Sequence, residues 1–234
     1  MHSYCTLFDS NYLTRGLAMY ESLKKYSENF YLYIFAFDDR SYELLKKLNL
    51  EFVTVIPLKE FEDKDLLQIK ADRSSREYCW TCTPSTIRFC IENYNLDACT
   101  YLDADLYFFS NPNVLIDEMN EKSVLITEHR YSPQYDQTAI SGIYCVQFMT
   151  FKNDENGMKA LNWWRDSCID WCYDKFEDGK LGDQKYLDDW TSRFKGIHVL
   201  QNLGGGVAPW NVQQYDLLSD ESFHLIFFHF HGYK

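Results

Sequence analysis

The apolar and polar positions of this 234-residue chain alternate between short apolar runs and segments in which apolar residues recur every three or four positions. Such runs are typical of buried strands, and such segments of helices with one buried face. The runs predict strands at Tyr4–Phe8, Phe30–Phe37, Phe52–Ile56, Cys99–Leu102, Val124–Thr127, Ile143–Phe151 and Phe223–Phe230. The periodic segments predict helices at Thr14–Tyr26, Tyr42–Leu48, Pro84–Tyr94, Asn156–Tyr173 and Asp183–Trp190. This alternation indicates an α/β fold with a mostly parallel central sheet flanked by helices.

The sequence contains no linker rich in Pro, Gly or Ser, no repeat and no low-complexity tract. We therefore expect one domain over residues 1–234. The final segment ends at Lys234, directly after a predicted strand and two histidines, which suggests truncation at the C-terminus. Hydrophobic residues make up 46% of the chain and aromatic residues 18%, so a disordered protein is excluded.

The formal net charge of -12 excludes nucleic acid or an anionic membrane as the main partner, since both bind basic surfaces. An acidic protein that binds a diphosphate has to neutralise it locally. A divalent cation is the natural means of doing so.

The N-terminus lacks the basic and apolar regions of a signal peptide, and no apolar stretch is long enough for a transmembrane segment. We therefore expect a cytoplasmic protein, with a peripheral position at the inner membrane face left open. The eight cysteines are then expected as thiols. Neither Cys79 with Cys82 nor Cys168 with Cys172 has the partners that a structural zinc site requires.

Two aspartates separated by one small residue follow the strand predicted at Cys99–Leu102. They are Asp103 and Asp105, with Ala104 between them. Ligands of open α/β sheets bind beyond the carboxyl ends of the strands, and paired carboxylates there suit Mg²⁺ or Mn²⁺. A polar strand end without a ligand is the alternative interpretation.

The stretch Tyr101–Leu106 resembles the DxD motif of GT-A-fold glycosyltransferases, above all family 8, which includes glycogenin and bacterial lipopolysaccharide galactosyltransferases. The resemblance implies a Rossmann-like nucleotide-binding domain. It further implies that Asp103 and Asp105 hold Mn²⁺ (or Mg²⁺) against the diphosphate of a nucleotide-sugar, with Ala104 beside it. The implied reaction moves a hexose, with retention, from a UDP-sugar to a saccharide or glycolipid acceptor.

Two further segments extend the resemblance. The first is similar to the family's nucleotide-base loop and supplies the candidate residues Leu7, Asp9, Asn11 and Tyr12. The second is similar to its H-x-x-G segment, which implies His229 as the third metal ligand and Gly232 and Lys234 as diphosphate neighbours, although Lys234 is offset from the family's lysine. If this segment is extended, His231 faces the opposite side from His229.

Other positions match less completely. Asp183 and Gln184 resemble the family's Asp-Gln pair beside the transferred sugar, although Asp183 also suits a helix cap. Arg88 corresponds to a basic residue near the donor, or else is a surface cation. Cys145 and Gln147 depart from the family's sugar-contacting stretch and put the donor sugar in doubt. A loop with three glycines at 204–206, followed by Trp210, is either a sugar-side loop or a plain turn.

Three alternative functions stay open at this point. The chain could be a catalytically silent nucleotide-sugar-binding module, which the Cys145 and Gln147 departures favour. It could be a metal-dependent hydrolase of nucleotide-sugars. A metal-dependent nucleotidyltransferase is the third alternative, although the Phe8–Tyr12 loop lacks the basic residues expected to bind a triphosphate.

Overall fold

The computed structural model describes residues 1–217 and 222–233. A seven-stranded sheet with the order β3-β2-β1-β4-β7-β6-β8 forms its centre, and a separate ribbon pairs β5 with β9. The strands are β1 (His2–Phe8), β2 (Phe30–Ala36), β3 (Val53–Pro57), β4 (Ala98–Leu102), β5 (Leu106–Phe108), β6 (Val124–Glu128), β7 (Tyr144–Lys152), β8 (Ile197–Val199) and β9 (Phe227–His229).

Helices connect most of these strands. The α-helices are α1 (Leu13–Tyr26), α2 (Asp39–Leu48), α3 (Leu58–Phe61), α4 (Lys64–Ile69), α5 (Ser75–Tyr94), α6 (Asn113–Asp117), α7 (Thr138–Ser141), α8 (Glu155–Asp170) and α9 (Trp190–Arg193). Short 3-10 helices are η1 (Lys70–Asp72), η2 (Pro133–Tyr135), η3 (Lys185–Asp189) and η4 (Val212–Gln214). Within the described residues, no helix is both long and apolar enough to cross a bilayer.

The sheet is mostly parallel, as predicted. β1 pairs in parallel with β2 and β4, β2 with β3, and β6 with β8. Only β7 runs against its neighbours β4 and β6. The carboxyl ends of six strands therefore lie along one edge of the sheet, which is the edge where a ligand is expected.

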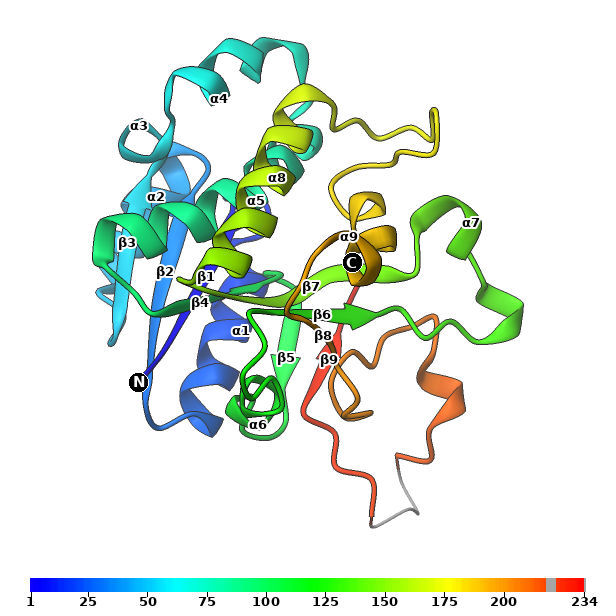
Figure 1. The fold of residues 1–234 in the computed structure, drawn as a ribbon. Helices are drawn as coiled ribbons and strands as arrows, with labels where there is room; N and C mark the ends of the chain where they lie inside the picture. The colour runs from blue at the N-terminus through cyan, green and yellow to red at the C-terminus, as the bar shows by residue number, and fades with distance from the viewer. Residues whose placement is uncertain (218–221, 234) are drawn as a thin grey trace.

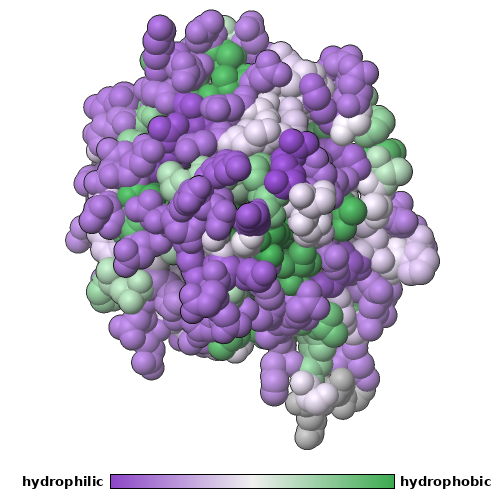
Figure 2. All heavy atoms as spheres, in the orientation of Figure 1, coloured by the Kyte–Doolittle hydropathy of each residue, from purple (hydrophilic) through white to green (hydrophobic). Residues whose placement is uncertain are grey.

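Helices cover both faces of the sheet (Figure 1). α5 and α8 pack side by side on one face, whereas α1 and α6 lie on the other. Adjacent residues of β1 serve the two layers, since Tyr4 belongs to the core under α1 and Cys5 to the core under α5. The visible surface is mainly hydrophilic, with apolar atoms in separate patches (Figure 2).

The helix predicted to begin at Pro84 begins at Ser75 instead. The Ser74 side chain accepts a hydrogen bond from the Glu77 amide, and the Glu77 carboxylate accepts one from the Ser74 amide. This capping box starts the helix more than two turns before Pro84, which lies inside it. Proline is favoured at a helix start and costly inside a helix, but the packing of α5 outweighs that cost at Pro84. The added turns extend α5 to the ligand edge of the sheet.

Two other predicted elements differ from the structure. The segment predicted as a helix at Asp183–Trp190 forms η3 followed by α9, and the strand predicted at Phe223–Phe230 is reduced to β9. The ladder partner of β9 is β5, which has three residues, and on its other side, among the described residues, β9 makes only an isolated bridge to Val207.

The start of α8 lies against the end of β7, and this contact yields a stability prediction. A Cβ atom on Gly157 would lie 2.2 Å from the Lys152 carbonyl oxygen. Because backbone cannot move aside cheaply, we expect Gly157→Ala to lower the free energy of unfolding by about 1–3 kcal/mol in urea titrations. Lys159→Ala, at an exposed position of the same helix, should change it by less than about 0.5 kcal/mol. Equal effects would contradict the packing argument.

Candidate active site

The aspartate pair lies in a turn that follows β4 and is fixed from two sides. The Asp103 amide donates to the Gln147 carbonyl of β7 at 3.0 Å, and the Phe230 amide donates to the Asp105 carbonyl at 2.9 Å. These bonds join β4, β7 and the segment after β9 at the ligand edge of the sheet. The predicted position of the pair, at the carboxyl end of a central strand, is what the structure has.

His229 lies against both carboxylates. Its Nε2 atom is 3.1 Å from Asp105 Oδ1 and 3.7 Å from Asp103 Oδ2. The His229 side chain is only 3% exposed, compared with 25% for Asp103 and 11% for Asp105. The structure therefore brings together the three residues that the sequence predicted as metal ligands.

Gln147 fixes the orientation of the His229 ring. The Oε1 atom of this fully buried glutamine lies 2.9 Å from His229 Nδ1. An amide oxygen only accepts hydrogen bonds, so this contact places a proton on Nδ1 and makes Nε2 the nitrogen that faces the carboxylates. Gln147, which looked like a departure from the family pattern, thus supports the histidine.

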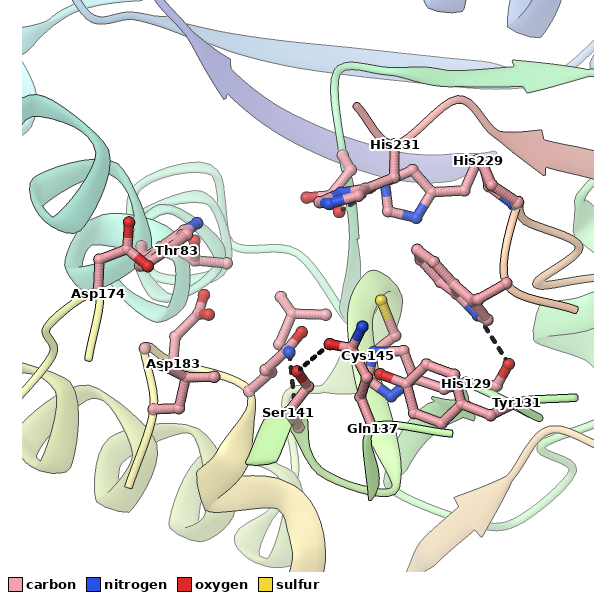
Figure 3. A pocket seen from close by; sticks show the side chains of 18 of the residues that line it. Thr83, His129, Tyr131, Gln137, Ser141, Cys145, Asp174, Asp183, His229 and His231 are labelled. Carbon is pink, nitrogen blue, oxygen red and sulfur yellow. Dashed lines mark hydrogen bonds and ion pairs between the residues drawn. The ribbon is translucent and has the colours of Figure 1, made fainter. Parts of the chain in front are cut away.

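His231 is not where the sequence argument placed it. The extended backbone ends at His229, and residues 231–232 form a turn, in which Gly232 has a φ of +72°. The rule that alternate residues face opposite sides applies only to extended chain, so it fails here. His229 and His231 lie side by side along one wall of the site (Figure 3), with ring centroids 5.5 Å apart.

The site concentrates negative charge in a poorly solvated place. Burial raises the pKa of Asp103 to about 8, with Asp105 and Asp183 adding to the shift and His229 opposing it. Burial also acts to raise the pKa of Asp105, but the hydrogen bond from His229 outweighs it and the pKa is lowered. Burial would lower the pKa of His229, but its bond to Asp105 reverses the direction. These shifts describe an anionic cluster that a bound cation would relieve.

Two hollows meet at this cluster, with volumes of about 470 and 500 Å³. Both are lined by Asp103, His229 and His231, together with Trp80 of α5. The cluster therefore lies at a junction, where it can contact ligand groups in either hollow. We refer to the hollow of about 500 Å³, which Leu7 and Tyr12 line, as the N-terminal hollow. The hollow of about 470 Å³, which Tyr131 and Trp210 line, is the aromatic hollow.

The N-terminal hollow contains the predicted base-binding and diphosphate residues. Its lining includes Leu7, Asp9, Asn11, Tyr12, Ala104, Asp105 and Gly232. The Asp9 carboxylate accepts bonds from the amide and the side-chain nitrogen of Asn11, each at 2.9 Å, which holds the loop in shape. The ring of Tyr12 is 43% exposed. Lys234, the remaining predicted member, lies outside the described residues.

The aromatic hollow contains the predicted sugar-side pair. Asp183 and Gln184 line it near Thr83, and Figure 3 shows the Asp183 carboxylate facing the cavity. The Asp183 side chain caps no helix, because η3 begins later and has no side-chain cap. Burial raises the pKa of Asp183 to about 7, although a hydrogen bond with Thr83 and backbone bonds oppose the shift. Gln184 donates to the Ser141 carbonyl at 2.9 Å.

Aromatic rings form the far wall of this hollow. His129 and Tyr131 stack with centroids 4.5 Å apart, and the Trp210 indole donates to the His129 carbonyl at 2.8 Å. Trp210 therefore lines the site as its loop position suggested. The glycines before it serve packing, because a Cβ on Gly204 would lie 2.0 Å from the His224 carbonyl oxygen.

The structure places Arg88 away from both hollows, as a surface cation, and Arg76 was missed. Arg88 pairs with Glu92 one turn along α5 and lines neither hollow. Arg76 lines the N-terminal hollow and pairs with Asp174, which lines the other, at 2.8 Å. Arg76, Trp80 and Thr83 share one face of α5 at helical spacing. The signal that could have revealed them is the capping box that starts with Ser74.

The pKa of Asp183 generates a prediction for the metal-free protein. Between pH 4 and 7 the native carboxyl holds a proton that the unfolded chain has released, so stability falls as pH rises through this window and then levels off. We expect Asp183→Asn to raise the free energy of unfolding at pH 8 by on the order of 2 kcal/mol, and by clearly less at pH 5. Urea titrations in EDTA measure both. Asp97→Asn, at an exposed position, should show no such pH-dependent gain in stability. If Asp183→Asn raised the free energy of unfolding equally at pH 5 and pH 8, the raised pKa of Asp183 would be refuted.

Known proteins resemble the chain in sequence and in fold, although no family model matches it. It is 32% identical to the uncharacterized protein YfnD of Bacillus subtilis (strain 168), over 98% of this chain and 77% of YfnD. It is 28% identical to YfnF of the same strain, over 99% of this chain and 82% of YfnF.

Solved glycosyltransferases share the fold at low sequence identity. Mouse xyloside xylosyltransferase 1 superposes with a TM-score of 0.62 at 15% identity, covering 99% of this chain and 98% of that one. The galactosyltransferase LgtC, in complex with donor and acceptor sugar analogs, has a TM-score of 0.62 at 12% identity, covering 98% and 87%. The bifunctional glycosyltransferase WbbM has a TM-score of 0.61 at 12% identity, covering 99% and 46%. The chain thus has the fold of GT-A-type glycosyltransferases, and it belongs to the same family as YfnD.

Proposed function

We propose that this protein is a metal-dependent glycosyltransferase, related to family 8, that moves a hexose from a UDP-sugar to a saccharide or glycolipid acceptor with retention. The observation that carries the proposal is the junction of the two hollows at Asp103, Asp105 and His229. A nucleotide-sugar has its diphosphate between base and sugar, so it fits a site with its charged cluster between two compartments. The solved relatives in fold are themselves named as glycosyltransferases.

The donor set fits a divalent cation of the Mn²⁺ or Mg²⁺ kind. Asp103 and Asp105 offer hard oxygen atoms, and Gln147 directs His229 Nε2 toward them, where a cation would displace its proton. Burial raises the pKa of Asp103 even though His229 opposes the shift, so the carboxylates are not fully compensated by the protein's own groups. When bound, the cation would neutralise the donor diphosphate and the charge that grows on the leaving group.

The N-terminal hollow suits the nucleoside diphosphate. The exposed ring of Tyr12 offers a stacking face for a base, and the Asp9–Asn11 turn presents fixed polar groups beside it. Among the described residues, Arg76 supplies the only lysine or arginine side chain that lines either hollow. Its guanidinium is the protein's own cation for the phosphates.

The aromatic hollow suits the transferred sugar and its acceptor. Asp183 is held by Thr83 at the edge of the charged cluster, where a carboxylate would stabilise positive charge at the anomeric carbon. Gln184 provides an amide beside it for sugar hydroxyls. The wall of Tyr131 and Trp210 offers apolar faces of the kind that stack on sugar rings, which favours a saccharide-containing acceptor.

Donor binding tests the metal assignment. UDP with Mn²⁺ should raise the thermal midpoint of the wild type, and EDTA should remove most of the gain, since about 2.7 kcal/mol of stabilisation is expected at a hundredfold excess over Kd. Asp103→Asn and Asp105→Asn should each abolish the Mn²⁺-dependent part, because the amide lacks the charge that a hard cation needs. Asp97→Asn, at an exposed position, should respond like the wild type. An unchanged response in both site variants would refute the proposal.

Product analysis tests the reaction itself. Incubation with UDP-hexoses, Mn²⁺ and a panel of oligosaccharides should yield a glycoside whose anomeric configuration, read by NMR, matches that of the donor. Release of free hexose regardless of acceptor would indicate a hydrolase instead. Binding of the donor without turnover of any panel member would favour the silent binding module.

Replacement of Gln147 tests the support of His229. Gln147→Leu removes the acceptor that fixes the Nδ1 proton, so the Mn²⁺ affinity measured by calorimetry should fall by about 10- to 100-fold. Gln147→Glu keeps an acceptor oxygen and should recover most of that affinity, as carboxylates commonly support metal-bound histidines. If Gln147→Leu binds Mn²⁺ as tightly as Gln147→Glu does, the glutamine does not orient the His229 ring.

A further inference from the structure

The turn after β9 brings a second imidazole to the metal cluster. The Tyr233 amide donates to the Phe230 carbonyl at 3.1 Å and closes a tight turn around His231 and Gly232. The positive φ of Gly232, +72°, is a conformation that residues with a side chain rarely adopt. The turn ends the strand at His229 and directs His231 back toward the carboxylates.

Three of the candidate ligand atoms converge as a single cation requires, and Asp103 lies next to this group, with Oδ2 3.7 Å from His229 Nε2. Asp105, His229 and His231 each offer one atom, and these three atoms all lie within 4.8 Å of one another. Metal–ligand bonds of about 2.0–2.3 Å place neighbouring ligand atoms some 3–4.5 Å apart, so one ion reaches all three after small side-chain adjustments. The two rings are nearly perpendicular, at 82°, so they meet edge to face and are not stacked.

The surroundings hold His231 in place while leaving its nitrogen atoms available. The Trp210 ring packs edge-on against both histidines, with centroids 5.5 Å from His229 and 5.6 Å from His231. No hydrogen bond among residues 1–217 and 222–233 engages a ring nitrogen of His231. The buried or half-buried His129 and His198 differ in this respect, since each has a protein partner.

We propose that His231 is a fourth protein ligand, so that the cation is held by two carboxylates and two imidazoles. This rests on the proposed function, because it concerns the same metal site. A second imidazole favours Mn²⁺, Co²⁺ or Zn²⁺ over Mg²⁺, which prefers oxygen ligands and keeps its waters. The protein should therefore discriminate strongly between Mn²⁺ and Mg²⁺, and His231 should be the residue that creates the difference.

Calorimetric titration of Mn²⁺ and of Mg²⁺ into the full chain measures the discrimination. His231→Ala should weaken Mn²⁺ binding by about 10- to 100-fold while changing Mg²⁺ binding much less, so that the ratio of the two affinities falls. The matched control is His224→Ala, an exposed histidine that lines neither hollow. It should keep the wild-type ratio. Circular dichroism verifies that each variant is folded.

Pulsed electron paramagnetic resonance of bound Mn²⁺ tests direct ligation, which an indirect structural role would not mimic. The nitrogen couplings should indicate two imidazoles in the wild type and in His224→Ala, and one in His231→Ala. One imidazole in the wild type, with Mn²⁺ affinity unchanged in His231→Ala, overturns the inference and leaves the three-residue site intact. Failure of the wild type to bind Mn²⁺, or binding that ignores Asp103→Asn, overturns the proposed function as well.

Discussion

The contact on which the site depends is the buried hydrogen bond between Gln147 and His229. It joins β7, in the middle of the main sheet, to β9, which lies outside that sheet, and the two residues are 82 positions apart in the chain. By fixing one nitrogen of the imidazole, it decides what the other nitrogen faces. Without this hydrogen bond, the end of β4 would offer a cation only the carboxylates of Asp103 and Asp105.

This arrangement leaves an energetic conflict in the metal-free protein. Asp103 is half-buried near the buried Asp183, and desolvation raises the pKa of both. A fold selected for stability alone would not gather carboxylates where water is scarce. Such conflicts are characteristic of functional sites, because the groups that strain the empty protein are those that a charged ligand satisfies.

Local patterns in the sequence were sufficient for six strands of the main sheet and for the aspartate pair, but they missed β8. Buried strands such as β2 read as unbroken apolar runs, and a carboxylate pair at a strand end has few structural uses. The first turns of α5, which carry Arg76 and Trp80, were not predicted. Pro84 was taken as the helix start, and the capping box upstream was overlooked. The sequence also could not reveal that Gln147 reaches His229, since side-chain pairing between distant strands leaves no local signal. The orientation of His231 depended on a turn whose single glycine, Gly232, is also a family motif residue.

The β5–β9 ribbon carries His229, so an ion bound at the site would connect two distant segments of the chain. The ribbon is attached to the body of the protein by the buried side chains of Phe108 and Phe227 in the core under α1, by short backbone ladders and by the Gln147–His229 contact. Any ion shared by Asp103 and His229 would close a long loop of the chain, much as a disulfide does. Such a link acts mainly by lowering the conformational entropy of states in which the ribbon is detached. Loading of the site would then add to the core packing that already holds the C-terminal ribbon, so protease resistance of the ribbon would rise with metal occupancy.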